Sequence, residues 1–522
     1  MRRQVVIVSV VVGLVAASCS GDATTTEATD SGAATTTSTT TSTTEASTTT
    51  EPSTTTEAAA DGVGTLTEFV NGRAELTVPL DHDDPGGPTI AVPVWLRPAD
   101  DPDARIGVLL VNPGGPGVAA NGLVRAADNI YAERLLEVFD IVAVDPRGTS
   151  PSTAVDCGNG IDEYLGAVDW SPEDQAELDE LDRHIQGQVD RCVGADPDLI
   201  DHVSTMDTVH DHAMLIEALG EETATWFGFS YGTTLGAALV TEYPELIRAA
   251  VFDGASQHVG YGDPVAELLA DAEADEALLV RILEGCDASG DCPIDGPAID
   301  AFRRVAAAAD EDPFDDDPAL VPVNQQLFGW VIAAGPHAYG GPTLPLLTAV
   351  AAADDGDGSL LQQYVADAAD FQQLFSGFLQ IICLDYPYRG ETPYPDDIDD
   401  LVDEVAPTRA SVFPTPEFLE DVQLPGECER WPVGPELLPG PLSGEGGGPV
   451  LLVTATGDPV TPKGSADALA EELVNETVLV VEDDQHVSYN KFGNEAQRCA
   501  TRVINDFLVD LEVPPEGFVC GP

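Results

Sequence analysis

One short stretch of this sequence constrains the fold more than any other. An apolar run beginning at Ala224 meets the pentapeptide Gly228-Phe-Ser-Tyr-Gly232, and a pattern rich in small residues continues to Val240. Together they predict a buried strand, a sharp corner and a helix, with Ser230 on the corner at the carboxyl edge of a sheet. Glycine on both sides leaves room for the chain to turn. Ser230 is therefore the candidate nucleophile, and an ordinary glycine-serine turn is the alternative.

Two sources of backbone amides are candidates for stabilising negative charge beside this serine. The helix that starts at the corner directs its free N–H groups toward it, and the amide of Tyr231 is the first donor. The second source follows the apolar run 106–111, which is typical of a central parallel strand. The loop Asn112-Pro-Gly-Gly-Pro-Gly117 leaves its main chain unobstructed, so Gly115 or Gly114 can donate a further hydrogen bond. A plain tight turn is the alternative.

An acid and a histidine occupy matching places later in the chain. The apolar runs 449–454 and 477–481 predict two more strands, which lead into Asp458 and His486. Because parallel strands present their carboxyl ends at one edge of a sheet, we expect both side chains near Ser230. The chain order of Ser230, Asp458 and His486 is that of an α/β-hydrolase. In that fold the histidine takes the serine proton and the acid orients the imidazole.

Other residues compete for these roles. Asp253 also ends a predicted strand and is the main competitor of Asp458. Asp483 and Asp484 precede His486 too closely to orient its ring, and we interpret them as solvated or turn residues. Seven further histidines lie in predicted loops, helices or the lid: His82, His184, His202, His210, His212, His258 and His337.

The order of the predicted elements indicates an α/β-hydrolase with a central, mostly parallel sheet. Strands expected over 66–70, 74–79 and 89–96 form an antiparallel edge. The strand over 138–144 leads into Asp145-Pro-Arg147, whose two charged side chains are expected to hold neighbouring loops together.

Strands and helices stop alternating over 255–447, where helices expected at 264–284 and 299–310 are separated by Pro- and Gly-rich loops. An insertion of this size predicts a large, mainly helical lid that controls substrate entry. The core is therefore expected over 63–254 and 448–522.

The first 62 residues have the character of an export signal and a tether. Arg2-Arg3, an apolar run and a small-residue stretch ending at Cys19 have the form of a signal peptide over 1–19. This ending resembles a bacterial lipobox, which implies lipidation of Cys19, with simple secretion as the alternative. Residues 20–62 cannot bury enough apolar surface to order, so we expect a disordered stalk. The sequence thus predicts an extracellular protein, lipid-anchored to the outer face of the membrane or secreted.

The charge of the chain excludes one class of partner. It carries 92 acidic residues against 21 basic ones, a formal net charge of −71. Such a surface repels a polyanion, so nucleic acid is not an expected partner. No motif calls for a metal or an organic cofactor, and membrane contact is expected only through a lipid at Cys19.

The remaining cysteines indicate disulfides. Setting Cys19 aside leaves eight, an even number that suggests four bridges in an exported protein. Pairing neighbours in sequence gives Cys157–Cys192, Cys286–Cys292, Cys383–Cys428 and Cys499–Cys520. Eight cysteines allow 105 connectivities, so this pairing is one proposal among many. A zinc site is a weaker interpretation, since no close Cys-x-x-Cys pair stands beside histidines.

Several motifs combine into a more specific pattern. They are Asn112-Pro-Gly-Gly-Pro-Gly117, Asp145-Pro-Arg-Gly148, Gly228-Phe-Ser-Tyr-Gly-Thr233, Asp253-Gly254, Cys383 with Cys428 and Trp431-Pro432, Asp458-Pro-Val-Thr-Pro462, and Cys499 with Cys520. From residue 65 onward the chain resembles exported actinobacterial tripeptidyl aminopeptidases, which belong with the prolyl-aminopeptidase-like serine hydrolases. Two positions depart from that family: Thr149-Ser150 replaces the usual Val-Gly, and Asp484-Gln485 stands where a Gly-rich approach to the histidine is common.

The resemblance implies a serine exopeptidase that releases di- or tripeptides, or proline-containing N-terminal residues, from free peptide N-termini through an acyl-enzyme. It also implies that lid carboxylates bind the substrate ammonium. Asp385 is one candidate, with a structural or solvated acid as the alternative. Two other functions stay open, namely an esterase or lipase with the same triad and a non-catalytic surface lipoprotein. The intact Ser230, Asp458 and His486 argue against the last, because a decayed site usually loses one of them.

Overall fold

The computed structural model describes residues 62–521 with several gaps. The gaps are positions 150–152, 156, 158–163, 171, 173, 257–263, 334–342, 369–371, 386–427, 429, 435–437 and 439. The predicted signal peptide, Cys19, the stalk up to residue 61, and two of the candidate histidines, His258 and His337, lie outside the described residues.

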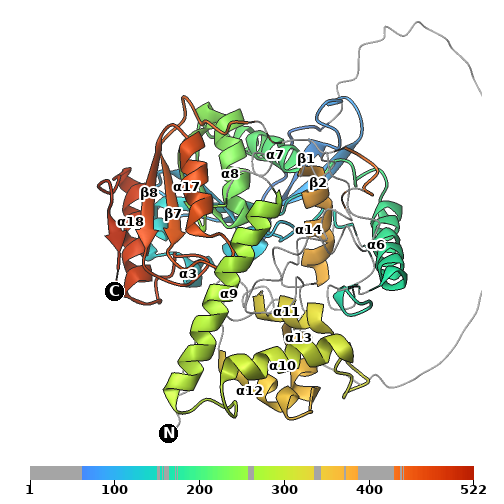
Figure 1. The fold of residues 1–522 in the computed structure, drawn as a ribbon. Helices are drawn as coiled ribbons and strands as arrows, with labels where there is room; N and C mark the ends of the chain where they lie inside the picture. Colours follow the sequence, from blue (N-terminus) through green and yellow to red (C-terminus); the bar gives the residue numbers. More distant parts are fainter. Residues whose placement is uncertain are drawn as a thin grey trace, which may run out of the picture.

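One twisted sheet forms the centre of the molecule (Figure 1). In the described residues it has nine strands in the order β1-β2-β4-β3-β5-β6-β7-β8-β9. The strands are β1 (Arg73–Pro79), β2 (Thr89–Arg97), β3 (Gly107–Asn112), β4 (Phe139–Val144), β5 (Ala224–Phe229), β6 (Ile247–Asp253), β7 (Val450–Ala455), β8 (Glu476–Val481) and β9 (Val519–Cys520). The pairs β1–β2 and β2–β4 are antiparallel and the other neighbours are parallel. The expected mostly parallel sheet with an antiparallel edge is confirmed.

The two edges of the sheet differ from expectation. The prediction of a strand over 66–70 is wrong, because only two single bridges form there, Leu66 to Leu76 and Val70 to Arg73. At the opposite edge, β9 pairs with β8 over two residues that the sequence did not mark as a strand. A two-residue strand has too little periodicity to be recognised.

Helices cover both faces of the sheet (Figure 1). One face carries α7 (Thr205–Ala218), α8 (Tyr231–Glu242) and α17 (Lys463–Glu472), and the other carries α2 (Asn121–Arg125), α3 (Ala127–Ile130), α4 (Glu133–Val138) and α18 (Glu495–Asp510). A short 3-10 helix, η1 (Pro244–Leu246), precedes β6. Successive residues of a central strand serve opposite layers, since Trp226 packs into the first and Phe227 into the second. The sheet is therefore buried on both faces, as its continuous apolar runs predict.

A second group of helices lies beside this α/β core (Figure 1). It consists of α6 (Gln175–Ala195), α9 (Pro264–Ser289), α10 (Ala298–Glu311), α11 (Gln325–Ala333), α12 (Thr343–Asp354), α13 (Ser359–Ala368) and α14 (Gln372–Asp385). Helices α9 to α13 share a hydrophobic cluster with Tyr164, Trp170 and two α6 residues, Leu181 and Ile185. The helical layer therefore also includes α6, which lies before residue 254 and outside the range predicted for the lid.

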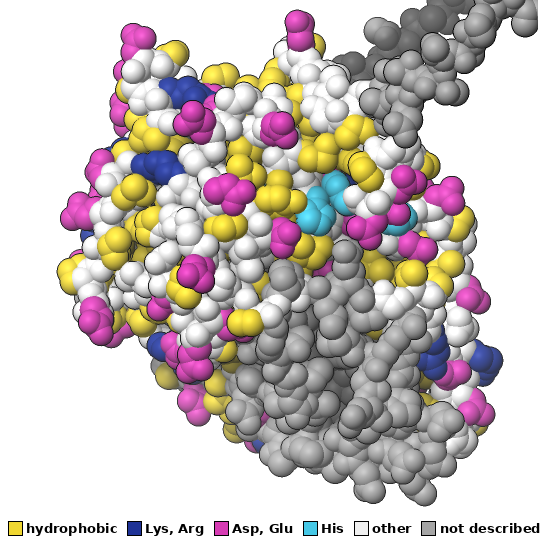
Figure 2. Space-filling view, turned by 90° about the horizontal axis from the view of Figure 1, so that it is seen from above, with side chains coloured by type: hydrophobic (Ala, Val, Ile, Leu, Met, Phe, Trp, Pro, Cys, Tyr) yellow, Lys and Arg dark blue, Asp and Glu magenta, His cyan; other side chains and the backbone are white. Residues whose placement is uncertain are grey.

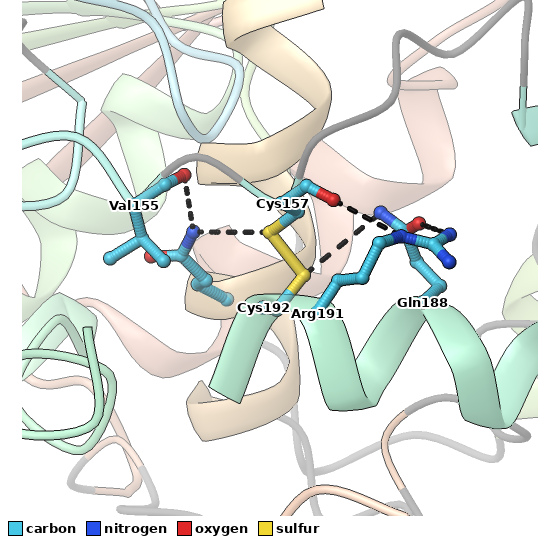
Figure 3. Close-up of a disulfide and its surroundings, with 6 residues drawn as sticks. Val155, Cys157, Gln188, Arg191 and Cys192 are labelled. Carbon is cyan, nitrogen blue, oxygen red and sulfur yellow. Dashed lines mark hydrogen bonds between the residues drawn. A yellow bond between two sulfur atoms is a disulfide. The ribbon is translucent and has the colours of Figure 1, made fainter. Parts of the chain in front are cut away.

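Four disulfides join the pairs proposed from neighbouring cysteines. Figure 3 shows Cys157–Cys192, where Arg191 donates to the Cys157 carbonyl at 3.3 Å. Gln380 of α14 donates to the Val155 carbonyl at 3.3 Å, so α14 and α6 are tied to the loop after β4. Disulfides of this kind belong to oxidising compartments, which agrees with an extracellular protein. Within the described residues, every helix is too short or too polar to span a bilayer.

The acidic excess is spread over the surface. Figure 2 shows Asp and Glu side chains scattered across one face, with few Lys and Arg among them. Some basic residues lie between two carboxylates, as Arg105 does between Asp140 and Glu221. Distributed negative charge keeps a protein soluble and disfavours binding of polyanions.

Arg147 forms the main buried ion pair of the α/β core. Its side chain is fully buried, and Nε and one terminal nitrogen donate to the two Asp211 oxygens at 2.9 and 2.7 Å. Its remaining N–H groups bind main-chain oxygens of Pro79, Leu80 and His202. Burial alone would raise the pKa of Asp211, but the charges and hydrogen bonds of Arg147 and His82 together lower it. Arg147 therefore joins β1 and the loop before α7 to α7, as expected. Asp145 also joins two segments, because its carboxylate accepts a hydrogen bond from the indole of Trp95.

Replacing Arg147 with methionine is expected to lower the free energy of unfolding by about 3–5 kcal/mol, because buried Asp211 loses its permanently charged partner and keeps its contact with His82. Arg73→Met is the matched control, since the Arg73–Glu75 pair is exposed and such pairs contribute about 0–1 kcal/mol. Denaturant unfolding of both variants measures the difference. Equal losses would show that the buried pair is not important for stability.

Candidate active site

The corner between β5 and α8 has the geometry that its sequence predicts. Ser230 is partly exposed and adopts φ 53° and ψ −129°, a conformation that L-residues rarely populate. A Cβ on Gly228 would lie 2.1 Å from the Gly232 carbonyl oxygen, and one on Gly232 would lie 2.8 Å from the Asn112 carbonyl oxygen. Trp226 donates its indole N–H to the Gly232 carbonyl at 3.1 Å. Close backbone packing therefore holds Ser230 on the corner.

His486 and Asp458 lie together in the loops that follow β8 and β7. Both side chains are buried, and the Nδ1 atom of His486 lies 3.0 and 3.1 Å from the two Asp458 oxygens. Asp458 also accepts from the amides of Val460 and Thr461, each at 2.9 Å, and from the Thr461 hydroxyl at 3.0 Å. When Nδ1 donates to Asp458, Nε2 carries the lone pair that a general base requires. The geometry thus fits the roles expected for these two residues.

The competitor Asp253 has different partners. Its carboxylate accepts from the amides of Ser488 and Tyr489 at 2.9 and 2.7 Å, whereas both Asp458 oxygens face the imidazole of His486. The structure therefore favours Asp458 as the acid that orients His486. Asp484 instead pairs with Arg281 of α9 at 3.0 Å.

The loop after β3 lies directly against the serine corner. A Cβ on Gly114 would lie 2.8 Å from the Cβ of Ser230 and 3.2 Å from the amide nitrogen of Tyr231. The Gly114 amide donates to the Asn112 side chain at 2.9 Å, so it is committed to holding the loop. Of the two alternatives, the structure favours Gly115 as the second donor to an oxyanion, together with the amide of Tyr231.

Two lid helices contact the loops of the site. Gly377 of α14 packs on the loop after β3, where an added Cβ would lie 2.8 Å from the Cα of Gly117. On the other side, Arg281 of α9 reaches Asp484, two residues before His486. The helical layer therefore contacts both the loop of the candidate oxyanion donors and the loop of the candidate base.

Asp385 is the residue considered for binding a substrate ammonium. It is buried at the end of α14, and its two oxygens accept from the amide and the hydroxyl of Thr205 at 2.8 and 2.6 Å. The Thr205 hydroxyl also bonds the phenol of Tyr231, and burial together with the Asp385 charge raises the pKa of Tyr231. These contacts favour the structural alternative for Asp385, which joins α14 to the start of α7.

Four other histidines in the described part of the chain bond groups outside the candidate triad. His82 bonds Asp211, His184 bonds the Tyr164 carbonyl, His210 bonds the Tyr243 hydroxyl and His212 bonds the Thr208 carbonyl.

Sequence reasoning missed three residues of the site. Thr461 lies three residues after Asp458 in the turn that begins there, so a Thr at this spacing is a signal for a hydroxyl donor to the carboxylate. Asn112 was recognised as part of the loop but not as the acceptor that occupies the Gly114 amide. Gly377 carries no local signal, because its partner Gly117 belongs to a distant part of the chain.

Two protein-family models match parts of this chain. A family model described as "alpha/beta hydrolase fold" matches residues 107–286, and one described as "TAP-like protein" matches residues 416–520. The chain is a TAP-like α/β-hydrolase. The first range contains Ser230 and ends within α9, and the second contains both Asp458 and His486.

Curated relatives of this TAP-like hydrolase have more than one activity in their names. Serine protease Hip1 of Mycobacterium tuberculosis is 28% identical over 466 residues, which cover 85% of this chain and 86% of that protein. Carboxylesterase B of the same species is 27% identical over 469 residues, 86% of each chain. Tripeptidyl aminopeptidase of Streptomyces lividans is 30% identical over 183 residues, 34% of each chain. With this fold and these relatives, the TAP-like hydrolase is a serine hydrolase.

Replacing Gly377 with alanine is expected to lower kcat about tenfold, which corresponds to about 1.4 kcal/mol in the barrier. The added methyl would displace the loop of the candidate oxyanion donors, since backbone lies 2.8 Å from the new Cβ. The measurement is steady-state kinetics with whichever substrate is turned over.

Gly285→Ala is the matched control, because Gly285 also lies in a lid helix and a Cβ there meets nothing within 4 Å. It is expected to keep kcat and to gain up to about 1 kcal/mol of stability from helix propensity. An unchanged kcat in a folded Gly377→Ala variant would contradict any influence of α14 on the loop.

Proposed function

We propose that this serine hydrolase is an extracellular exopeptidase that releases di- or tripeptides, or proline-containing N-terminal residues, from free peptide N-termini. The observation that carries the proposal is the position of the lid, whose helices α9 and α14 contact loops of the site. Helices that contact two loops of the candidate site favour the end of a chain over an internal segment, because an internal segment needs open space on both sides of the serine.

The reaction follows from the candidate residues. His486 takes the hydroxyl proton as Ser230 attacks the scissile carbonyl, and the oxyanion accepts N–H bonds from Tyr231 and Gly115. Asp458 stabilises the imidazolium that forms. His486 then returns the proton to the leaving amine, which leaves an acyl-enzyme on Ser230. A water molecule, deprotonated by His486, releases the short peptide and restores the serine.

Two further observations support a peptide substrate with a free amine. Relatives of the chain bear the names of a serine protease and of a tripeptidyl aminopeptidase. The net charge of −71 also concentrates cationic substrates near the protein, whereas nucleic acid is repelled. We further propose that Cys19 carries a lipid that anchors the enzyme to the outer face of the membrane, in agreement with the disulfides.

A second candidate function is hydrolysis of carboxylic esters by the same triad. The specific observation in its favour is the relative named Carboxylesterase B, which matches as much of this chain as the protease does. Esters need less help from the leaving-group proton than amides do, so the same residues suffice for that reaction.

A panel of four substrates separates these functions: a free-amine tripeptide anilide, its N-acetylated twin, a single-residue proline anilide and a short-chain ester. We expect the free-amine tripeptide to be cleaved at least tenfold faster, in kcat/KM, than its acetylated twin. Ser230→Ala is the control, and it should fold normally and lose turnover of every substrate. Preference for the ester, or indifference to acetylation, would establish the esterase instead.

A further inference from the structure

Asp253 connects the candidate nucleophile and the candidate base. It is fully buried at the carboxyl end of β6. Its main-chain oxygen accepts from the amide of Ser230 at 3.0 Å. Its side-chain oxygens accept from the amides of Ser488 and Tyr489 at 2.9 and 2.7 Å. One residue therefore contacts both the serine corner and the chain that follows His486.

The segment over 486–489 has no helix or strand to fix it, so individual bonds set its position. On the side of the ring, the bond from His486 to Asp458 orients the imidazole. At the far end, the Tyr489 hydroxyl accepts from the Ala132 amide and donates to Asn505, each at 3.0 Å. Between these two anchors, the Asp253 carboxylate holds the main chain two and three residues after the histidine.

Gly254, the next residue, completes the contact. It has φ +69°, and a Cβ there would lie 3.2 Å from the Cε1 atom of His486. The end of β6 therefore lies against the imidazole of His486 at Gly254 and holds the loop of His486 through Asp253. A shift of this loop by a fraction of an ångström would move Nε2 relative to the serine hydroxyl, and such shifts are costly for catalysis.

We propose that Asp253 is a positioning residue for hydrolysis, whose ionised carboxylate holds the 486–489 segment so that His486 stays aligned with Ser230. The role concerns the catalytic centre of the proposed function and applies equally to peptide and ester substrates.

The charge of Asp253 makes this hold dependent on pH. The pKa of Asp253 is raised from 3.8 to about 7, mainly by burial and to a small extent by the Asp458 charge, although the two amide bonds and the His486 charge lower it. The phenol of Tyr489, whose own pKa is raised by burial, is the remaining titratable group that faces it. A protonated carboxyl has one oxygen occupied by its proton, so it cannot hold both amides equally well. Alignment of His486 should therefore weaken below neutral pH.

Stability should respond to pH in the opposite sense. Between about pH 4 and 7 the folded protein keeps the Asp253 proton and the unfolded chain does not. The folded state binds more protons in this window, so the contribution of Asp253 to stability falls as pH rises through it. A residue with a purely structural role would not couple rising activity to falling stability.

The test is the pH dependence of inactivation by a small fluorophosphonate, which reports on the reactivity of Ser230 without assuming any substrate. In the unaltered enzyme, both His486 and Asp253 must lose a proton, so the logarithm of the rate should rise with a slope near two on the acid side. Asp253→Asn should lower the rate at pH 8 at least tenfold and reduce that slope to near one. With the substrate it turns over, the variant should lose kcat while KM changes less than about threefold.

Asp145→Asn is the matched control. Asp145 is also a buried acid at the carboxyl end of a strand, and burial raises its pKa, but its side chain bonds Trp95 and Asn121. This variant should keep a slope near two and its kcat. In denaturant unfolding, the stability of Asp253→Asn relative to the unaltered enzyme should increase between pH 5 and 8.

The outcomes separate this inference from the proposed function. A slope of one in the unaltered enzyme, or an unchanged slope and kcat in Asp253→Asn, would overturn the role of Asp253. If Asp253→Asn does not fold, the slope of the unaltered enzyme decides alone, with two supporting the role and one overturning it. The substrate panel can fail while this test succeeds, because fluorophosphonates react with esterases and peptidases alike.

Discussion

The candidate active site of this protein depends on a close approach of main chains that only glycine permits. Ser230 sits in a backbone conformation that costs about 1–3 kcal/mol, and the surrounding contacts must hold it there. Gly228 and Gly232 pack their backbones against each other and against Asn112, while Gly114 lies on Ser230 itself. This packing brings the ends of β3 and β5 together. It also places an amide-rich loop beside Ser230.

The parallel sheet then delivers the remaining groups to the same edge. β6 ends at Asp253, β7 leads to Asp458 and β8 leads to His486, so three neighbouring strands supply the acid, the base and the anchor of its loop. β6 and β7 are almost completely buried and β8 is partly buried, whereas the loops beyond the strands are held by individual hydrogen bonds. Side-chain oxygens satisfy loop amides on both sides of the imidazole, through Asp458 and through Asp253. Two residues of the helical layer also contact loops of the site: Gly377 lies against Gly117, and Arg281 pairs with Asp484.

Much of this arrangement could be predicted from the sequence, because it is encoded locally. The corner at Ser230, the helix that follows it and the strands before Asp458 and His486 follow from periodicity and turn residues. The pairing of the eight cysteines agrees with simple adjacency, since each partner is the next cysteine along the chain. The family resemblance stated from the motifs agrees with the TAP-like and α/β-hydrolase models.

What the sequence did not reveal depends on contacts between distant segments. The bond of the Gly114 amide to Asn112 favours Gly115 as the candidate oxyanion donor, and only the folded loop shows this bond. The bonds of Asp385 to Thr205 and of Asp253 to the 486–489 segment assign two acids whose sequence contexts allowed other roles. The recruitment of α6 to the helical layer was missed because an amphipathic helix does not specify which neighbour covers its apolar face.

The most direct test of the central claim is to identify the residue that a fluorophosphonate modifies. The enzyme would be labelled at pH 8, digested and mapped by mass spectrometry, with His486→Ala labelled in parallel. We expect a single adduct on the peptide that carries Ser230, and no adduct on that peptide in His486→Ala. An adduct on another serine, or labelling of Ser230 that does not depend on His486, would contradict it.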